Sequence, residues 1–154
     1  MSVLTSKFDI LRGYPNGSGT PWSFPIKMNG TVPYSVYAGT IVTQESQNNK
    51  TVAALATTPN TGSAEPIQMW LTVEGNDDFS GQFVVGCNTV LLSSGIVWET
   101  DVFTAGTYAV GGAVSVSGGK VQDRGSNEQT IAYVLENNIA TKGTITLVGA
   151  PWGK

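Results

Sequence analysis

The stretch FTAGTYAVGGAVSVSGGKVQDRGSNEQTIAYVLENNIATKGTITLV, Phe103–Val148, decides the fold class. It is a series of short runs rich in β-branched residues, each ended by Gly-Gly, Gly-Lys, Asn or Lys-Gly. Such runs between turn formers are typical of β-strands. One segment, Leu135–Ala140, could be helical, but Asn137-Asn138 disfavours it. The expected strands are Thr107-Tyr108, Ala113–Val116, Lys120-Val121, Thr130–Glu136 and Gly143–Val148.

The middle of the chain continues this pattern. Val36–Gln44 and Thr51–Thr57 flank the turn residues Gln47-Asn48-Asn49, which predicts a hairpin. In Ile67–Val73, the apolar residues Ile67, Met69, Leu71 and Val73 alternate with Gln68, Trp70 and Thr72, which predicts a strand with one buried face. Further strands are expected at Phe79–Val85, Val90–Leu92 and Gly95–Glu99. Short, regularly spaced strands predict an all-β sandwich or small β-barrel.

Residues 1–35 differ from the β-domain that we expect over 36–154. Four of the seven prolines fall in this segment, and GYPNGSG at residues 13–19 cannot hold regular structure. Its aromatic and aliphatic side chains must therefore lie on the domain or dock on a partner, and we interpret the segment as an extended N-terminal arm. We expect a folded β-domain to survive its deletion. The candidate contact residues are Phe8, Ile10, Leu11, Tyr14, Trp22, Phe24 and, near the other end of the chain, Trp152.

The composition narrows the function. Charged residues make up 12% of the 154 residues, about half the usual share. The net charge of −3 and the scattered basic residues argue against a nucleic-acid partner. No apolar run approaches the roughly 18 residues of a membrane helix, and because the first residues lack a continuous apolar run we expect no signal peptide. We expect no membrane partner and synthesis in the cytoplasm.

The residues that usually carry chemistry are scarce. The chain has no histidine, which excludes His-dependent nucleophiles and the usual zinc sites. The single cysteine, Cys87, is expected to be a packed core residue. Glu74, Asp77 and Asp78 could hold a hard cation such as calcium, although EGNDD is also good turn chemistry. Glu99 and Asp101 could form a glycosidase pair, but nothing around them supports it. We therefore expect no enzyme, no catalytic residue, no cofactor and no metal.

The four tryptophans divide into two pairs. Trp70 and Trp98 lie within predicted strands and are expected in the core, whereas Trp22 and Trp152 lie in Pro/Gly-rich end segments and are expected at an interface. An aromatic platform for sugars is the alternative interpretation.

The run from Ser94 onward resembles the head decoration (capsid cement) proteins of tailed bacteriophages. The likeness rests on Gly-x-Tyr-x-x-Gly at Gly106–Gly111, the V-x-V-x-x-Gly-Lys hairpin at Val114–Lys120, the I-x-Y-V-L type of strand at Ile131–Leu135 and the closing Gly-Thr-x-Thr strand at Gly143–Thr146. The first hairpin, Gly39–Leu55, is also similar to the opening of such domains. The resemblance covers about two thirds of the chain, and Thr58–Gly95 departs from it.

The resemblance implies a small β-barrel or sandwich of the β-tulip type, with an extended N-terminal arm. It implies a virion structural protein that binds the major capsid protein on the outside of the assembled, expanded head and stabilises that state without catalysis. A homotrimer at local threefold positions is the expected assembly, with a homodimer as the alternative. Two other functions stay open: another phage structural component, such as a tail-tube or baseplate protein, and a carbohydrate-binding adhesin module.

Overall fold

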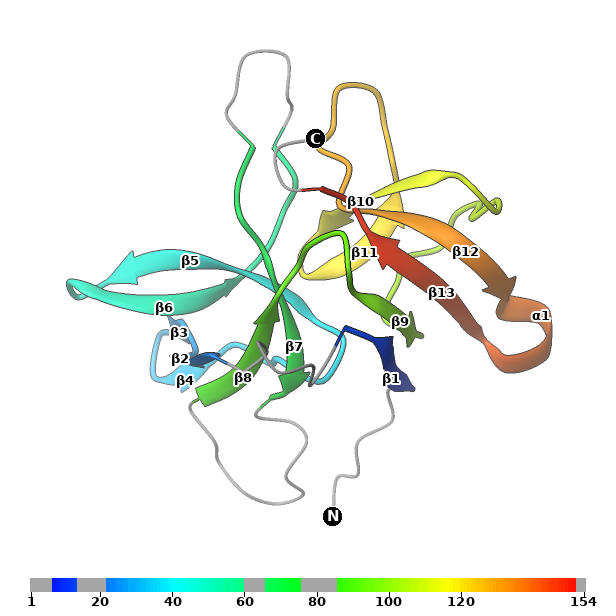
Figure 1. Cartoon of the computed structure of the whole chain (residues 1–154). Coiled ribbons are helices and arrows are strands. Elements are labelled where there is room, and N and C mark those ends of the chain that lie inside the picture. Colours follow the sequence, from blue (N-terminus) through cyan, green and yellow to red (C-terminus); the bar gives the residue numbers. More distant parts are fainter. Residues whose placement is uncertain (1–6, 14–21, 60–65, 76–85, 152–154) are drawn as a thin grey trace.

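The computed structural model describes residues 7–13, 22–59, 66–75 and 86–151. These residues form two curled antiparallel sheets and one short hairpin, so the predicted all-β fold of the sandwich or small-barrel type is confirmed (Figure 1). The predicted strand Phe79–Val85 lies outside the described residues, as do Tyr14, Asp77, Asp78 and Trp152.

The six-stranded sheet contains most of the C-terminal third of the chain. Its strand order is β1-β9-β13-β12-β10-β11, and every neighbouring pair is antiparallel. Its strands are β1 (Phe8–Arg12), β9 (Val97–Thr100), β10 (Ala113–Ser117), β11 (Lys120–Asp123), β12 (Ala132–Asn138) and β13 (Thr144–Gly149).

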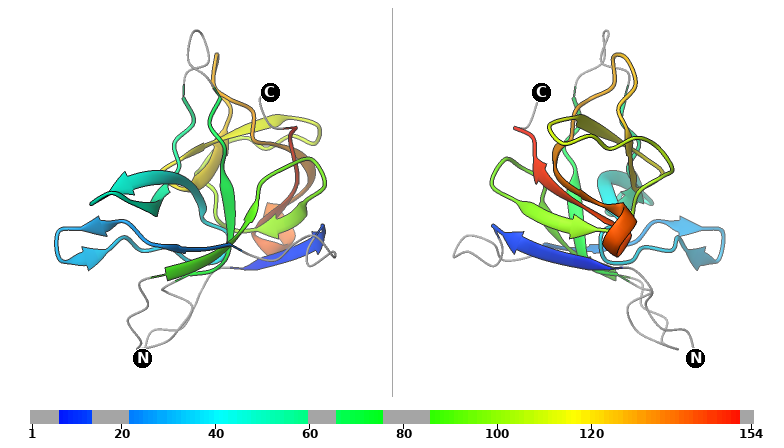
Figure 2. Two further views of the ribbon diagram at one scale, coloured as in Figure 1. Left: turned by 60° about the vertical axis from the view of Figure 1, so that its left-hand side comes forward. Right: turned by 90° about the vertical axis from the view of Figure 1, so that its right-hand side faces the viewer.

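The five-stranded sheet has the order β2-β8-β7-β5-β6. The short β3–β4 hairpin follows β2 and lies beside the β5–β6 hairpin in both views of that side of the molecule (Figures 1 and 2). These strands are β2 (Trp22–Pro25), β5 (Ile41–Gln47), β6 (Lys50–Leu55), β7 (Trp70–Glu74) and β8 (Gly86–Leu91), with β3 (Met28–Asn29) and β4 (Val32–Pro33) in the separate hairpin.

Two predicted hairpins are confirmed. In β5–β6 the turn residues Asn48 and Asn49 have φ of 53° and 62°, and in β10–β11 Gly118 and Gly119 have φ of 57° and 82°. Two successive residues with positive φ form the tight turn that matches the twist of a β-hairpin. Asn and Gly tolerate this conformation best, which is why the local sequence located both turns.

Two predicted strands differ from the structure, one in its existence and one in its end. Thr107-Tyr108 is not a strand, because Tyr108 turns inward and its hydroxyl donates to the carbonyl oxygens of Thr104 (2.7 Å) and Val121 (3.3 Å). β12 continues through Asn138, and a single helical turn, α1 (Ile139–Lys142), then leads to Gly143 at φ 73°. The Asn pair therefore ends a strand, as its low helix propensity indicated.

The main core lies between the two sheets. It includes Trp98, Leu71, Ile145 and Leu147, each fully or almost fully buried. The two sheets are also joined by backbone hydrogen bonds at the β10–β11 turn, where Gly119 donates to Ala56 and accepts from Ile41. One compact core thus spans residues from β5 to β13.

A second, smaller core cluster lies on the opposite face of the five-stranded sheet. It corrects the prediction that β7 buries only one face: Met69 and Leu71 face the main core, whereas Trp70, 7% exposed, packs into the second cluster. Both faces are buried because β2 curls over the far side of the sheet. The cluster consists of Phe24, Ile26, Val36, Val42, Ala53, Trp70 and Cys87.

The described part of residues 1–35 is thus integrated into both sheets. β1 pairs with β9, and β2 pairs with β8. Phe24 and Ile26 are 8% and 2% exposed within the second cluster. Their burial goes against the expectation that a deletion of residues 1–35 leaves the domain intact. The division of the chain at residue 35 itself stays a prediction.

Candidate functional site

The predicted contact residues that the structure describes lie on the end strands of the two sheets, with Phe8, Ile10 and Leu11 on β1 and Trp22 and Phe24 on β2. β1 is the end strand of the six-stranded sheet and β2 is the end strand of the five-stranded sheet. On β1, Phe8 and Ile10 are half-buried against the main core, whereas Leu11 is 53% exposed. On β2, Phe24 is buried and Trp22 is 63% exposed. Leu11 and Trp22 are therefore the two residues of this set that present a large apolar surface to solvent.

Both in-strand tryptophans are core residues, as predicted. Trp98 is fully buried in the main core, and its Nε1 has no hydrogen-bond partner among the described residues. Trp70 is buried in the second cluster, and its Nε1 donates to Gln44 Oε1 (3.4 Å). Trp98 cannot contact a ligand, whereas one edge of Trp70 borders the surface beside Trp22.

A groove opens where the five-stranded sheet almost closes on itself. β2 and β6 are the two end strands, and they meet in a parallel bridge between Ile26 and Ala53, with Lys27 N donating to Ala53 O (2.9 Å). Toward Trp22, side chains of both strands line a groove. The groove has a volume of about 380 Å³. Its lining residues are Trp22, Ser23, Phe24, Pro25, Gln44, Thr51 and Trp70.

The aromatic rings of the groove meet edge to face. The ring of Trp70 lies 6.3 Å from that of Trp22 at an interplanar angle of 67°, and 5.2 Å from that of Phe24 at 72°. These are favourable geometries for aromatic pairs, each worth about 0.5–1.5 kcal/mol beyond its buried area. Trp70 is thereby fixed from two sides, and it holds Trp22 at the rim of the groove.

The polar groups of the groove are uncharged. Gln44 uses its Oε1 for Trp70 and keeps its amide N–H groups, and Ser23 Oγ donates to Asn88 Oδ1 (2.5 Å) and keeps its lone pairs. The nearest ion pair, Lys27 with Glu45, is exposed, and the hydrogen bond to Glu45 raises the pKa of Lys27 above its usual value. No charged side chain is among the described residues that line the groove.

Cys87 lies beneath the groove and is inert. It is 4% exposed, opposite Phe24 in the β2–β8 pair. Burial raises the pKa of its thiol to about 11, so the nucleophilic thiolate is scarce at neutral pH. The prediction of a packed core cysteine is confirmed.

Among the acidic candidates, Glu99 has structural partners, Glu74 and Asp101 are described, and Asp77 and Asp78 lie outside the described residues. Glu99 accepts from Thr144 Oγ1 (2.7 Å) and pairs with Lys142 Nζ at 3.8 Å, which accounts for it as part of the sheet surface. Glu74 ends β7, and the alternative of a cation site with Asp77 and Asp78 lies outside the described residues. Within the described ranges, no three acidic or thiol side chains are grouped as metal ligands, and no helix is long and apolar enough to cross a membrane.

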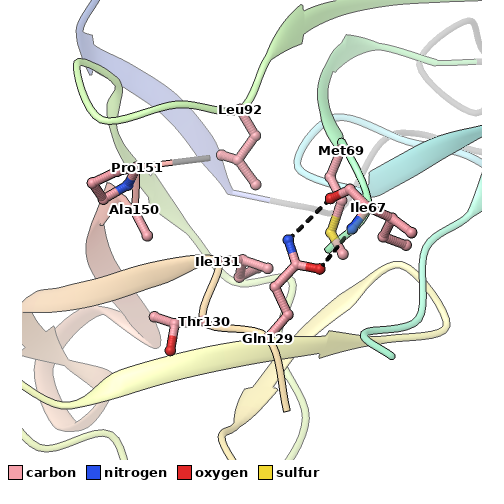
Figure 3. Close-up of a pocket in the computed structure, with 8 residues that line it drawn as sticks. All are labelled: Ile67, Met69, Leu92, Gln129, Thr130, Ile131, Ala150 and Pro151. Atoms are coloured by element: carbon pink, nitrogen blue, oxygen red, sulfur yellow. Dashed lines mark hydrogen bonds between the residues drawn. The ribbon is translucent and has the colours of Figure 1, made fainter. Parts of the chain in front are cut away.

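A second, smaller cavity lies beside a pair of hydrogen bonds with a structural role. Gln129 accepts from Ile67 N (3.0 Å) and donates to Ile67 O (2.9 Å), so that its side chain replaces a neighbouring strand (Figure 3). The cavity beside it has a volume of about 10 Å³, room for one water at most. Gln129 thus fastens the approach to β7 to the other sheet.

The structure adds groove residues that the sequence did not indicate. Gln44 and Thr51 lie on a predicted hairpin and look like ordinary solvent-facing strand residues, and Trp70 looks like core alone. Only the approach of β2 to β6 makes these residues neighbours of Trp22. No local signal in the sequence reports that approach.

Comparisons of the chain with family models, with characterised proteins and with solved structures find no match.

Proposed function

We propose that this chain is a virion structural protein that binds the assembled, expanded capsid of a tailed bacteriophage and stabilises it without catalysis. The proposal starts from the resemblance of the C-terminal third to head decoration proteins. The observation that carries it further is the position of the N-terminal strands. The segment predicted to make contacts supplies the end strand of each sheet, with Leu11 and Trp22 exposed there.

End strands suit this role for a physical reason. β1, at the end of the six-stranded sheet, offers backbone groups and side chains to a further strand from another chain. A surface with few charges loses little hydration when a partner covers it, since uncharged hydroxyls and amides are cheaper to desolvate than ions. The partner would be the major capsid protein, and the assembly would be a homotrimer or, alternatively, a homodimer.

The mechanism would be linkage by mass action. A protein that binds only the expanded lattice stabilises that lattice by RT ln(1 + [L]/Kd) per site, about 2.7 kcal/mol when its free concentration is 100 times Kd. Summed over many sites, this free energy opposes the pressure of the packaged genome. No covalent step is required.

Co-sedimentation tests this proposal. Purified protein is mixed with expanded capsids and with unexpanded precursors of the phage that encodes it, and the pelleted fraction is measured. We expect pelleting with expanded capsids only, and a loss of at least tenfold in affinity for Leu11→Asp. Val110→Asp is the matched control, because Val110 is 70% exposed in the turn before β10.

Two results would contradict the proposal. Failure of the unmodified protein to pellet with expanded capsids would exclude capsid binding. Assembly of the protein alone into tubes or rings would favour the alternative of a tail-tube or baseplate component. If Leu11→Asp and Val110→Asp weakened binding equally, the protein would still bind the capsid, but β1 would not be part of the contact.

A further inference from the structure

The groove between β2 and β6 has the size and composition of a ligand site. Its volume of about 380 Å³ falls within the roughly 300–1,000 Å³ typical of small-molecule pockets, which combine aromatic walls with a few polar groups. Trp22 forms one wall with most of its surface exposed, although a large aromatic side chain is usually covered in a protein without a partner. The groove therefore presents an uncovered aromatic surface that is already held in place.

We propose that this groove binds a neutral saccharide unit, stacked on the face of Trp22 and bounded by the edge of Trp70. Sugar rings have apolar C–H faces that pack on aromatic rings and a rim of hydroxyl groups, each of which donates and accepts hydrogen bonds. The groove matches both parts. Trp22 supplies the ring, and Thr51 supplies a hydroxyl that can donate and accept.

The free hydrogen-bonding capacity of the lining favours a polyol. After the contacts with Trp70 and Asn88, Gln44 retains amide donors and Ser23 retains acceptor lone pairs. Donors and acceptors thus lie within one small site, as hydroxyl groups require. A phosphate or carboxylate would find no cation among the described lining residues.

Three features disfavour a peptide in the same groove. Pro25 supplies no N–H to the edge of β2, which weakens strand addition there. The Nε1 of Trp70 donates to Gln44 and is not free for a peptide carbonyl. The bridge between Ile26 and Ala53 also closes one end of the groove, so that an extended chain could not pass through.

Isothermal titration calorimetry tests the proposal with defined probes. The full chain is titrated with neutral hexasaccharides of glucose (α-1,4 and β-1,4), mannose, xylose and N-acetylglucosamine, and with a decaproline peptide. We expect saturable binding of at least one hexasaccharide and none of decaproline. Because Trp22 supplies the ring on which the sugar stacks, Trp22→Ala should weaken that binding tenfold or more, and Trp22→Phe should restore part of it.

Two further variants separate stacking from hydrogen bonding and from general surface effects. Thr51→Val keeps the shape and removes the hydroxyl, and we expect a three- to tenfold loss of affinity. Leu11→Ala, at the exposed end strand of the other sheet, should leave affinity unchanged. Far-ultraviolet circular dichroism and urea unfolding establish that each variant is folded.

Three outcomes would overturn the saccharide site: no heat of binding with any hexasaccharide, equal binding by Trp22→Ala and the unmodified protein, or binding of decaproline alone. None of them bears on capsid binding, which is measured by co-sedimentation. The two proposals can therefore fail separately.

Discussion

The two antiparallel sheets of this protein differ in how their end strands are covered. In the six-stranded sheet, the far edge at β11 is covered, because Phe103 forms a bridge with Val121 and Thr104 N donates to Val121 O (2.8 Å). In the five-stranded sheet, the end strands β2 and β6 touch at one point and then separate into a groove. In the six-stranded sheet, the segment at Phe103 and Thr104 covers the β11 edge. In the five-stranded sheet, β2 covers the β6 edge only in part, which leaves a surface open to a ligand.

The tryptophans show the same contrast. Trp98 of the six-stranded sheet is fully buried, and Trp22 of the five-stranded sheet is 63% exposed. A buried tryptophan stabilises the fold through area removed from water and through packing. An exposed one contributes little to the fold and remains available for binding. The following predictions test how far this division of roles holds.

The largest effect is expected for Trp98→Ala. The substitution leaves a cavity in the main core, and we expect it to lower the free energy of unfolding by about 3–5 kcal/mol. Urea unfolding should therefore show a much lower midpoint with an unchanged slope. Trp22→Ala is the matched control, with an expected loss of only about 0.5–1.5 kcal/mol from the edge-to-face pair with Trp70. Similar losses for both variants would mean that the two tryptophans do not have different roles.

The next largest effect is expected for Phe24→Ala, at about 3 kcal/mol. Phe24 packs against Trp70 and is the buried residue that holds β2 over the second cluster. Hydrogen exchange should accelerate first in β2 and β8, with the six-stranded sheet still protected. Uniform acceleration in both sheets would show instead that the second cluster and the main core unfold as one unit.

A smaller and graded effect is expected at two turn glycines. Gly119→Ala places a Cβ 2.8 Å from Thr40 Cγ2 at φ 82°, in the turn that joins the two sheets. Gly30→Ala meets no atom within 4 Å at φ 70°, in the turn of the separate β3–β4 hairpin. We expect Gly119→Ala to lower the free energy of unfolding by about 2–3 kcal/mol, because the steric contact adds to the cost of a positive φ. Gly30→Ala carries only the cost of the positive φ, and we expect a loss of about 1 kcal/mol. Thermal unfolding of both variants measures the difference, and equal losses would contradict a linking role of the β10–β11 turn.

The sequence predicts the six-stranded region better than the five-stranded one for a physical reason. Strands β10 to β13 follow one another closely, with a tight turn at Gly118 and Gly119 after β10 and Gly143 at positive φ before β13, so that local signals determine them. The five-stranded sheet depends on the pairing of β2 with β8, more than sixty residues apart in the chain. The distant pairing buries Trp70 and Phe24 on the second face and creates the groove. Periodicity within one strand cannot report such a partner.

The smallest effect is expected at Cys87, and it tests whether water reaches the second cluster beneath the groove. The pKa of its thiol is about 11 in the folded state, above the ordinary value of 9.0, because burial disfavours the thiolate. Between pH 9 and 11 the unfolded chain therefore loses this proton while the folded chain keeps it, and the free energy of unfolding falls as pH rises. We expect Cys87 to contribute a loss of about 1–2 kcal/mol across this interval, seen as the difference between the unmodified protein and Cys87→Ala in urea unfolding at each pH. Parallel pH profiles for the two proteins would mean that water reaches the thiol, and the second cluster would then be an extension of the groove and not a floor beneath it.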